Sequence, residues 1–211
     1  MRRIWHYNGL SITLLILFFL FWAGQTLTGW HDYNNDQQSK NQPTSSLLQY
    51  VGSGEFAEAT FENWESEFLQ MAAYVLFTTF LFQKGSAESK DPDALESEEE
   101  SGDQVSSLRG WRLKLYENSL ALTFFALFLV SFLLHAWGGS RAYAQELIQD
   151  GQAPVGFWTF IISARFWFQS FQNWQSEFLA VASIVVLSIL LRQKGSPESK
   201  PIGSATSATG E

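Results

Sequence analysis

Residues 61–69 read FENWESEFL, and residues 171–179, which lie 110 positions further along the chain, read FQNWQSEFL. A second pair of segments has the same spacing, which we call the repeat offset, because residues 83–90 read QKGSAESK and residues 193–200 read QKGSPESK. Two long motifs would not recur at one offset by chance. We therefore infer a tandem duplication, and an internal repeat of this kind constrains the architecture more than any single motif does.

Each copy contains two apolar segments that predict transmembrane helices. The expected spans are residues of about 9–28, 64–83, 117–137 and 174–191. A spanning helix needs about 20 mostly apolar residues. The second segment of each copy is short and spans only if Trp64 and Trp174 lie at the membrane boundary. The sequence thus predicts an all-α membrane protein with four transmembrane helices, formed from a duplicated two-helix unit.

The expected organisation has four parts. Residues 1–90 form the first repeat, residues 91–108 an acidic cytoplasmic linker, residues 109–200 the second repeat and residues 201–211 a tail. The linker holds seven of the 21 acidic residues and no lysine or arginine, so it accounts for most of the net charge of -8. Segments of such composition cannot bury enough apolar surface to fold, and we expect the linker and the tail to be disordered.

The distribution of basic residues predicts the orientation. Four spans place both termini on one side, together with ten basic residues: Arg2, Arg3, Lys84, Lys90, Arg109, Arg112, Lys114, Arg192, Lys194 and Lys200. The opposite loops contain Lys40, Arg141 and Arg165. The positive-inside rule makes the first side cytoplasmic. Because an equivalent of the first apolar segment lies mid-chain, we expect that segment to be retained and not cleaved as a signal peptide.

The loops on the outer side are long, and each continues after a proline into a mixed aromatic segment. Residues 155–171 read VGFWTFIISARFWFQSF. This pattern predicts an interfacial helix, or a re-entrant element packed on the bundle.

Polar residues recur near the outer ends of the expected helices. The candidate cluster consists of Gln25, Asn63, Ser66, Glu67, His135, Asn173, Ser176 and Glu177. Two interpretations are open. Asn and Ser can hydrogen-bond between helices and fix their packing. Alternatively, carboxylates and a histidine at membrane depth can form a proton, cation or ligand site.

The QKGSxESK motif follows an apolar segment in both copies. A basic residue followed by glycine is typical of a helix C-terminus. We therefore predict helix C-caps at Lys84 and Gly85, and at Lys194 and Gly195.

Several classes of chemistry lack support in the sequence. The chain has no cysteine, which excludes disulfides, thiolate metal sites and iron–sulfur clusters. No P-loop, dinucleotide fingerprint, HExxH motif or nucleophile elbow is present. The basic residues are few and scattered, so nucleic acid is not an expected partner. We assign no catalytic residue, metal or cofactor and expect no enzymatic activity.

The tandem NWxSEF and QKGSxESK motifs resemble those of a bacterial family of integral membrane proteins catalogued only as a domain of unknown function. The resemblance extends from Asn8 to Lys200. It implies a multi-pass protein of the bacterial cytoplasmic (inner) membrane, and it implies no activity or ligand.

The expected function is that of a structural or accessory protein, which contacts the lipid bilayer and packs as a homo-oligomer or within a larger membrane complex. The alternative is a small oligomeric transporter or channel for protons or cations that uses the outer Glu/His cluster.

Overall fold

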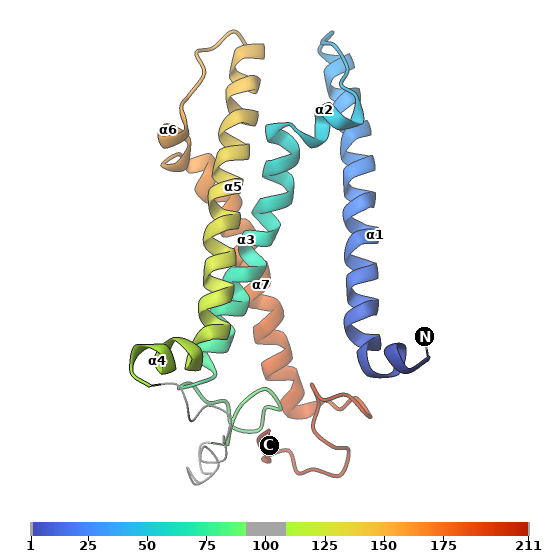
Figure 1. The fold of residues 1–211 in the computed structure, drawn as a ribbon, viewed down its shortest axis with the longest axis vertical. Helices are drawn as coiled ribbons and strands as arrows, with labels where there is room; N and C mark the ends of the chain where they lie inside the picture. Colours follow the sequence, from blue (N-terminus) through green and yellow to red (C-terminus); the bar gives the residue numbers. More distant parts are fainter. Residues whose placement is uncertain (1, 92–108, 211) are drawn as a thin grey trace. The chain divides into compact units, whose positions relative to one another are not determined.

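The computed structural model describes residues 2–91 and 109–210, and these ranges are helical with no β-strand (Figure 1). The helices are α1 Arg2–Ser39, α2 Leu47–Val51, α3 Gly54–Phe77, α4 Trp111–Glu117, α5 Ser119–Gln149, α6 Phe157–Ile161 and α7 Ala164–Leu190. The predicted all-α class is confirmed. Apart from Asp91, the predicted linker 91–108 lies outside the described residues.

Three helices within the described ranges are long and apolar enough to cross a membrane: Ile4–Ser39 in α1, Ser119–Gln149 in α5, and Ala164–Leu190, which is α7. The remaining long helix, α3, contains five glutamates. Its apolar part covers only residues 68–77, which are apolar with the exception of Gln70. Ten residues rise about 15 Å, half of the hydrocarbon core. The structure therefore supports a membrane protein with three clear candidate spans, and the fourth predicted span is not shown.

The end of α3 differs from the expected span of residues 64–83. The helix ends at Phe77 because two threonines follow and turn their hydroxyls back onto the chain. Thr78 Oγ1 donates to the Tyr74 carbonyl at 3.0 Å, and Thr79 Oγ1 donates to the Leu76 carbonyl at 2.6 Å. Such local hydrogen bonds compete with helix continuation. The position equivalent to Thr79 in the second copy is Ile189, which lies within α7.

The boundaries of the helices recur at the repeat offset of the sequence motifs. Helices α1 and α5 end at equivalent positions of the two copies, α2 and α6 begin and end at equivalent positions, and α3 and α7 begin at equivalent positions. The first turns of α3 and α7 are capped in the same way, by a serine side chain. The Phe56 amide donates to Ser53 Oγ at 3.2 Å and the Phe166 amide donates to Ser163 Oγ at 3.3 Å, which satisfies an otherwise free amide.

The expected interfacial segment 155–171 forms two elements, the short helix α6 and the first part of α7. A break at residues 162–163 separates them, and Ser163 serves as the N-cap of α7.

The described chain forms two compact units that do not follow the sequence repeats. Unit 1 comprises Met1–Thr60 and Ala136–Phe160, and unit 2 comprises Phe61–His135 and Ile161–Glu211. Each unit thus contains parts of both copies, because α3 and α5 contribute residues to both.

In unit 1, an aromatic side chain of each short helix packs against a glycine of a long helix. Tyr50 of α2 is buried against Gly29, where a Cβ atom would collide with the tyrosine hydroxyl. Phe160 of α6 is buried against Gly139, where a Cβ atom would lie 2.7 Å from the ring. The two contacts occupy equivalent positions of the two copies. Glycine allows each short helix to approach its long helix closely.

The start of α3 also approaches α5 closely within unit 1. A Cβ atom on Gly54 would lie 2.6 Å from the Gly138 carbonyl oxygen, and one on Gly138 would lie 2.6 Å from the Glu58 amide nitrogen. Small residues at a helix contact let the backbones approach, which is a common form of packing within membranes.

In unit 2, aromatic side chains connect the helices. The Phe132 and Phe166 rings meet edge to face with centroids 5.2 Å apart, and the Phe128 and Trp174 rings do so at 6.2 Å. These contacts join α5 to α7.

Candidate functional site

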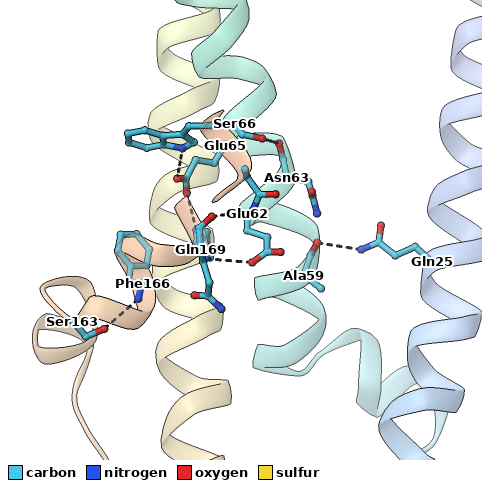
Figure 2. Close-up of polar contacts among 12 residues, drawn as sticks. Gln25, Ala59, Glu62, Asn63, Glu65, Ser66, Ser163, Phe166 and Gln169 are labelled. Atoms are coloured by element: carbon cyan, nitrogen blue, oxygen red, sulfur yellow. Dashed lines mark hydrogen bonds and ion pairs between the residues drawn. The ribbon is translucent and has the colours of Figure 1, made fainter. Parts of the chain in front are cut away.

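Glu65 of α3 is the centre of a buried polar contact in unit 2. Its side chain is 0% exposed, as is that of His135 on α5. One carboxylate oxygen, Oε2, lies 2.8 Å from His135 Nδ1, and the other, Oε1, accepts the Trp174 indole N–H at 2.9 Å. The carboxylate therefore connects α3, α5 and α7, and both of its oxygens have a partner (Figure 2).

Helical spacing places other polar side chains of α3 beside Glu65. Glu62 shares its face, since residues three or four apart are neighbours on a helix, and Ser66 is the next residue along the chain. Ser66 is buried and donates to the Asn63 carbonyl of its own helix at 2.7 Å. Figure 2 shows Glu62, Asn63, Glu65 and Ser66 along this part of α3.

The second ring nitrogen of His135 is also buried. Nε2 has no hydrogen-bond partner among the described residues, and its nearest acidic atom is Glu62 Oε2 at 3.9 Å. The Glu62 side chain is 25% exposed. The Phe166 ring packs on the imidazole with centroids 4.8 Å apart. Glu65, His135 and Glu62 thus form a series of ionisable groups that leads from a buried side chain to an accessible one.

This series can hold a proton as well as fix packing. A neutral imidazole whose Nδ1 donates to Glu65 leaves Nε2 as an acceptor. A protonated imidazole would direct a second N–H towards Glu62. The described residues contain no group of three His, Asp or Glu side chains arranged to bind a metal ion.

The repeat-equivalent positions carry neutral amides. Gln172 and Gln175 correspond to Glu62 and Glu65, and Gln25 corresponds to His135. Gln25 lies in unit 1, where its Nε2 donates to the Ala59 carbonyl at 3.2 Å (Figure 2). The ionisable set therefore occurs at only one of the two equivalent places in the repeat.

The predicted polar cluster is brought together only in part. Two of its eight residues, His135 and Ser66, are buried, and His135 is the one that contacts Glu65. Gln25, Asn63, Glu67 and Ser176 are exposed, and Asn173 and Glu177 are half-buried. Ser176 donates to the Asn173 carbonyl of its own helix at 2.8 Å.

The sequence pattern favours Glu67 because both copies carry a glutamate there. The buried contact instead forms at Glu65, which only the first copy carries, and with Trp174, which was expected at the membrane boundary. A sequence signal was available, since Glu62 and Glu65 stand three residues apart in one helix, on the same face.

The predicted helix C-caps are placed differently in the structure. Helix α3 ends at Phe77 and the C-cap of α7 is Leu191, so Lys84, Gly85, Lys194 and Gly195 all lie in the loops beyond the helices. The glycines do adopt positive φ values, +87° for Gly85 and +83° for Gly195, but they do so in turns. The helices end before the motif is reached, α3 at Phe77, where two threonines hydrogen-bond back onto the chain, and α7 at Leu190.

The two QKGSxESK loops have the same internal hydrogen bonds. The backbone amide of the glutamine donates to the second serine of the motif, at 2.9 Å for Gln83 to Ser89 and 2.8 Å for Gln193 to Ser199. The glutamate amide donates to the first serine in both loops. The motif therefore encodes a specific turn, which explains its repetition.

The first loop is also held by residues of the second copy within unit 2. Ser86 Oγ lies 3.0 Å from Ser188 Oγ of α7, and the Gly210 amide donates to the Ser86 carbonyl at 2.8 Å. The buried Lys200 ammonium donates to the carbonyls of Gly85, Thr206 and Ala208. The composition of the tail favours disorder, but the structure gives described residues 201–210 these contacts because a buried cation needs acceptors.

Two glutamates from the two loops influence each other. Burial raises the pKa of Glu88, the nearby Glu198 raises it further, and the hydrogen bond from the Tyr74 hydroxyl opposes these effects. That hydroxyl lies 2.8 Å from Glu88 Oε2. Glu88 Oε1 is buried without a partner among the described residues, so a proton held there would relieve both burial and repulsion.

Comparisons with known proteins give one finding. Neither the curated proteins nor the solved structures include a match to this chain. The family described as "Domain of unknown function (DUF6766)" matches residues 1–211, which is the whole chain. The protein therefore belongs to this family of unknown function.

Proposed function

We propose that the chain is a four-span protein of the bacterial cytoplasmic membrane, formed by duplication of a two-helix unit, with both termini in the cytoplasm. Support comes from the helix boundaries, the serine caps, the glycine–aromatic contacts and the loop hydrogen bonds, all of which recur at the repeat offset.

In this proposal α3 is the fourth span, although its glutamates lower its hydropathy. Glu65 does not face lipid, because its carboxylate is buried and accepts hydrogen bonds from His135 and Trp174. Beyond Phe77 the chain continues as TTFLF, so Phe80, Leu81 and Phe82 add apolar residues after the end of the helix. A short span of this kind is accommodated by local thinning of the bilayer.

The absence of cysteine makes this topology easy to test. Gln42→Cys and Gln152→Cys place single thiols at equivalent exposed positions of the two outer loops. With four spans, a membrane-impermeant maleimide added to intact cells labels both. With three spans and α3 on one side of the membrane, it labels only one, and the four-span proposal fails.

Within that topology, the function proposed is that of a non-enzymatic structural or accessory membrane protein. One observation carries this: both oxygens of the buried Glu65 carboxylate are engaged by side chains of two other helices. A carboxylate in this state fixes the register of three helices, and a rigid bundle with an outward apolar surface is suited to packing within the membrane.

The second candidate, a small proton or cation transporter or channel, is favoured by a different observation. His135 Nε2 is buried without a hydrogen-bond partner in the described chain and faces Glu62, which is partly exposed. Ionisable residues within membranes frequently mark proton and ion paths.

Proton and cation flux into proteoliposomes separates the two candidates. The protein is compared with Glu65→Gln and with a control, Glu67→Gln/Glu177→Gln, which makes the same chemical change outside the buried contact. The accessory role predicts no flux above protein-free vesicles for any of them. Flux in the natural protein that Glu65→Gln abolishes and the control retains would establish the transporter and refute the accessory role.

A further inference from the structure

Unit 2 contains an apolar cleft of about 710 Å³ that is separate from the Glu65 contact. Its walls come from α3, α4 and the first turns of α5. Leu69, Ala72, Ala73 and Leu76 form a stripe along α3, since these positions recur at the spacing of one helix face. Ala72 and Ala73 have small side chains and leave space that larger side chains would fill, which contributes to the cleft.

The opposite wall has a matching pattern. Asn118, Ala121, Leu122 and Phe125 line the cleft from the α5 side, again at the spacing of one helix face. Leu122 and Phe125 are 45% and 47% exposed, so apolar side chains remain accessible in this wall. The cleft is a groove that opens to the surroundings of the helices.

One end of the groove is lined by α4, which lies across the start of α5 (Figure 1). The two helices are separated at Asn118, whose side-chain amide donates to the Lys114 carbonyl at 2.8 Å. Trp111 and Leu115, four residues apart, both line the groove. A short helix with tryptophan and leucine on one face and basic residues nearby is typical of the membrane interface.

Positive charge is concentrated at this end. Arg109, Arg112 and Lys114 lie within six residues, in a chain with only 13 basic residues in total. Lys114 lines the groove itself, and the Arg112 guanidinium lies over the Trp111 ring at 5.7 Å from its centroid. Lys114 therefore lines this end of the groove and Arg112 lies beside its Trp111 wall, and Glu117 is the one acidic residue of α4.

We propose that this groove binds an anionic phospholipid, with an acyl chain along the apolar walls and the phosphate at Lys114 and Arg112. The order of the groove, apolar along its length and cationic at an interfacial end, matches a phospholipid. A partner helix of uniform apolarity would gain nothing from the cations. Basic pockets between membrane helices bind anionic headgroups by this combination of burial and charge.

Binding is measured on the full-length protein in detergent by native mass spectrometry, with phosphatidylglycerol, phosphatidylcholine or inorganic phosphate added. The proposal predicts one retained phosphatidylglycerol and weaker retention of phosphatidylcholine. Each cation near the headgroup contributes about fivefold in affinity. Lys114→Gln is thus expected to weaken phosphatidylglycerol retention about fivefold, and Lys114→Gln/Arg112→Gln about 25-fold.

Two further variants make the result specific. Lys194→Gln removes an exposed lysine of unit 2 far along the sequence from the groove and is expected to change nothing. Ala73→Phe fills the groove and is expected to abolish retention of both lipids. Since Lys114 is a basic residue of α4 at the end of the groove, its variant tests the proposal even if Ala73→Phe fails to fold.

Three results would overturn the proposal. Equal retention of the two lipids would show that charge plays no part. Retention of inorganic phosphate as strong as that of lipid would show an anion site without use of the groove. A change in oligomeric state for Ala73→Phe, with phosphatidylglycerol retention unchanged, would show that a second copy of the chain occupies the groove.

Discussion

Replacement of Glu65 by alanine should destabilise the protein more than any other change at an acidic residue of α3. The carboxylate accepts two hydrogen bonds, a buried one from His135 Nδ1 and a part-buried one from Trp174 Nε1. Hydrogen bonds between membrane helices contribute only about 0.6 kcal/mol each on average, which would give a loss of about 1 kcal/mol. Leaving a buried donor without an acceptor costs more, about 1–3 kcal/mol.

The cost of the unpaired donors is larger than that of the lost hydrogen bonds, so it sets the expected change in the free energy of unfolding. We expect Glu65→Ala to lower the free energy of unfolding by about 3 kcal/mol, at the lower end of the values for a broken buried pair. Glu65→Gln should cost about 1 kcal/mol, because the amide oxygen still accepts one of the two donors.

The repeat suggests a double variant that should recover part of the lost stability. The repeat-equivalents of Glu65 and His135 are Gln175 and Gln25, so amides are already present at those places in the repeat. In Glu65→Gln/His135→Gln, the new amides can donate as well as accept. We expect the double variant to lose less stability than the sum of the single variants, with a coupling of about 1 kcal/mol.

Unfolding is followed by circular dichroism in mixed micelles of increasing dodecyl sulfate fraction, with the exposed Glu67→Ala as the control on the same helix. The reasoning is refuted if Glu65→Ala and Glu67→Ala unfold at the same point. It also fails if the double variant loses the full sum of the two single losses.

Gly138→Ala should destabilise the protein by about 1–3 kcal/mol in the same assay, because its Cβ would lie 2.6 Å from the Glu58 amide nitrogen. The control Gly24→Ala has no neighbour within 4 Å and should be neutral or slightly stabilising. Equal effects of the two variants would contradict the close approach at Gly138. The pKa of Glu88 is raised in the folded protein above the ordinary glutamate value of 4.5. The contribution of Glu88 to stability is therefore greatest at acid pH, where the side chain is protonated, and it is lost as the pH rises through the folded-state pKa. Glu88→Gln should remove that loss and raise the thermal unfolding temperature at neutral pH, and an unchanged pH profile would argue against it. Lys200→Met should release the tail, since three backbone carbonyls lose their hydrogen-bond donor. Limited proteolysis should then cleave the tail faster than in the natural protein. Equal cleavage rates would show that Lys200 does not hold the tail.

The sequence by itself determined the periodic features of this protein. Apolar runs of sufficient length make α1, α5 and α7 candidate membrane spans, because hydropathy and helix length are local properties. The repeat offset between the motifs also appears in the helix boundaries, since caps such as Ser53 and Ser163 act on the turn that immediately follows them.

Only the tertiary structure decided which polar residues meet. The pairing of Glu65 with His135 and Trp174 joins residues 70 and 109 positions apart, and it depends on how three helices are rotated against one another. Residue identity shared by two copies favoured Glu67, whereas burial selected Glu65. The same holds for the QKGSxESK glycines, which were expected at helix C-caps but lie in turns, where their φ values are positive. Local pattern fixes what a segment can form, and long-range packing fixes which of its side chains are withdrawn from solvent and lipid.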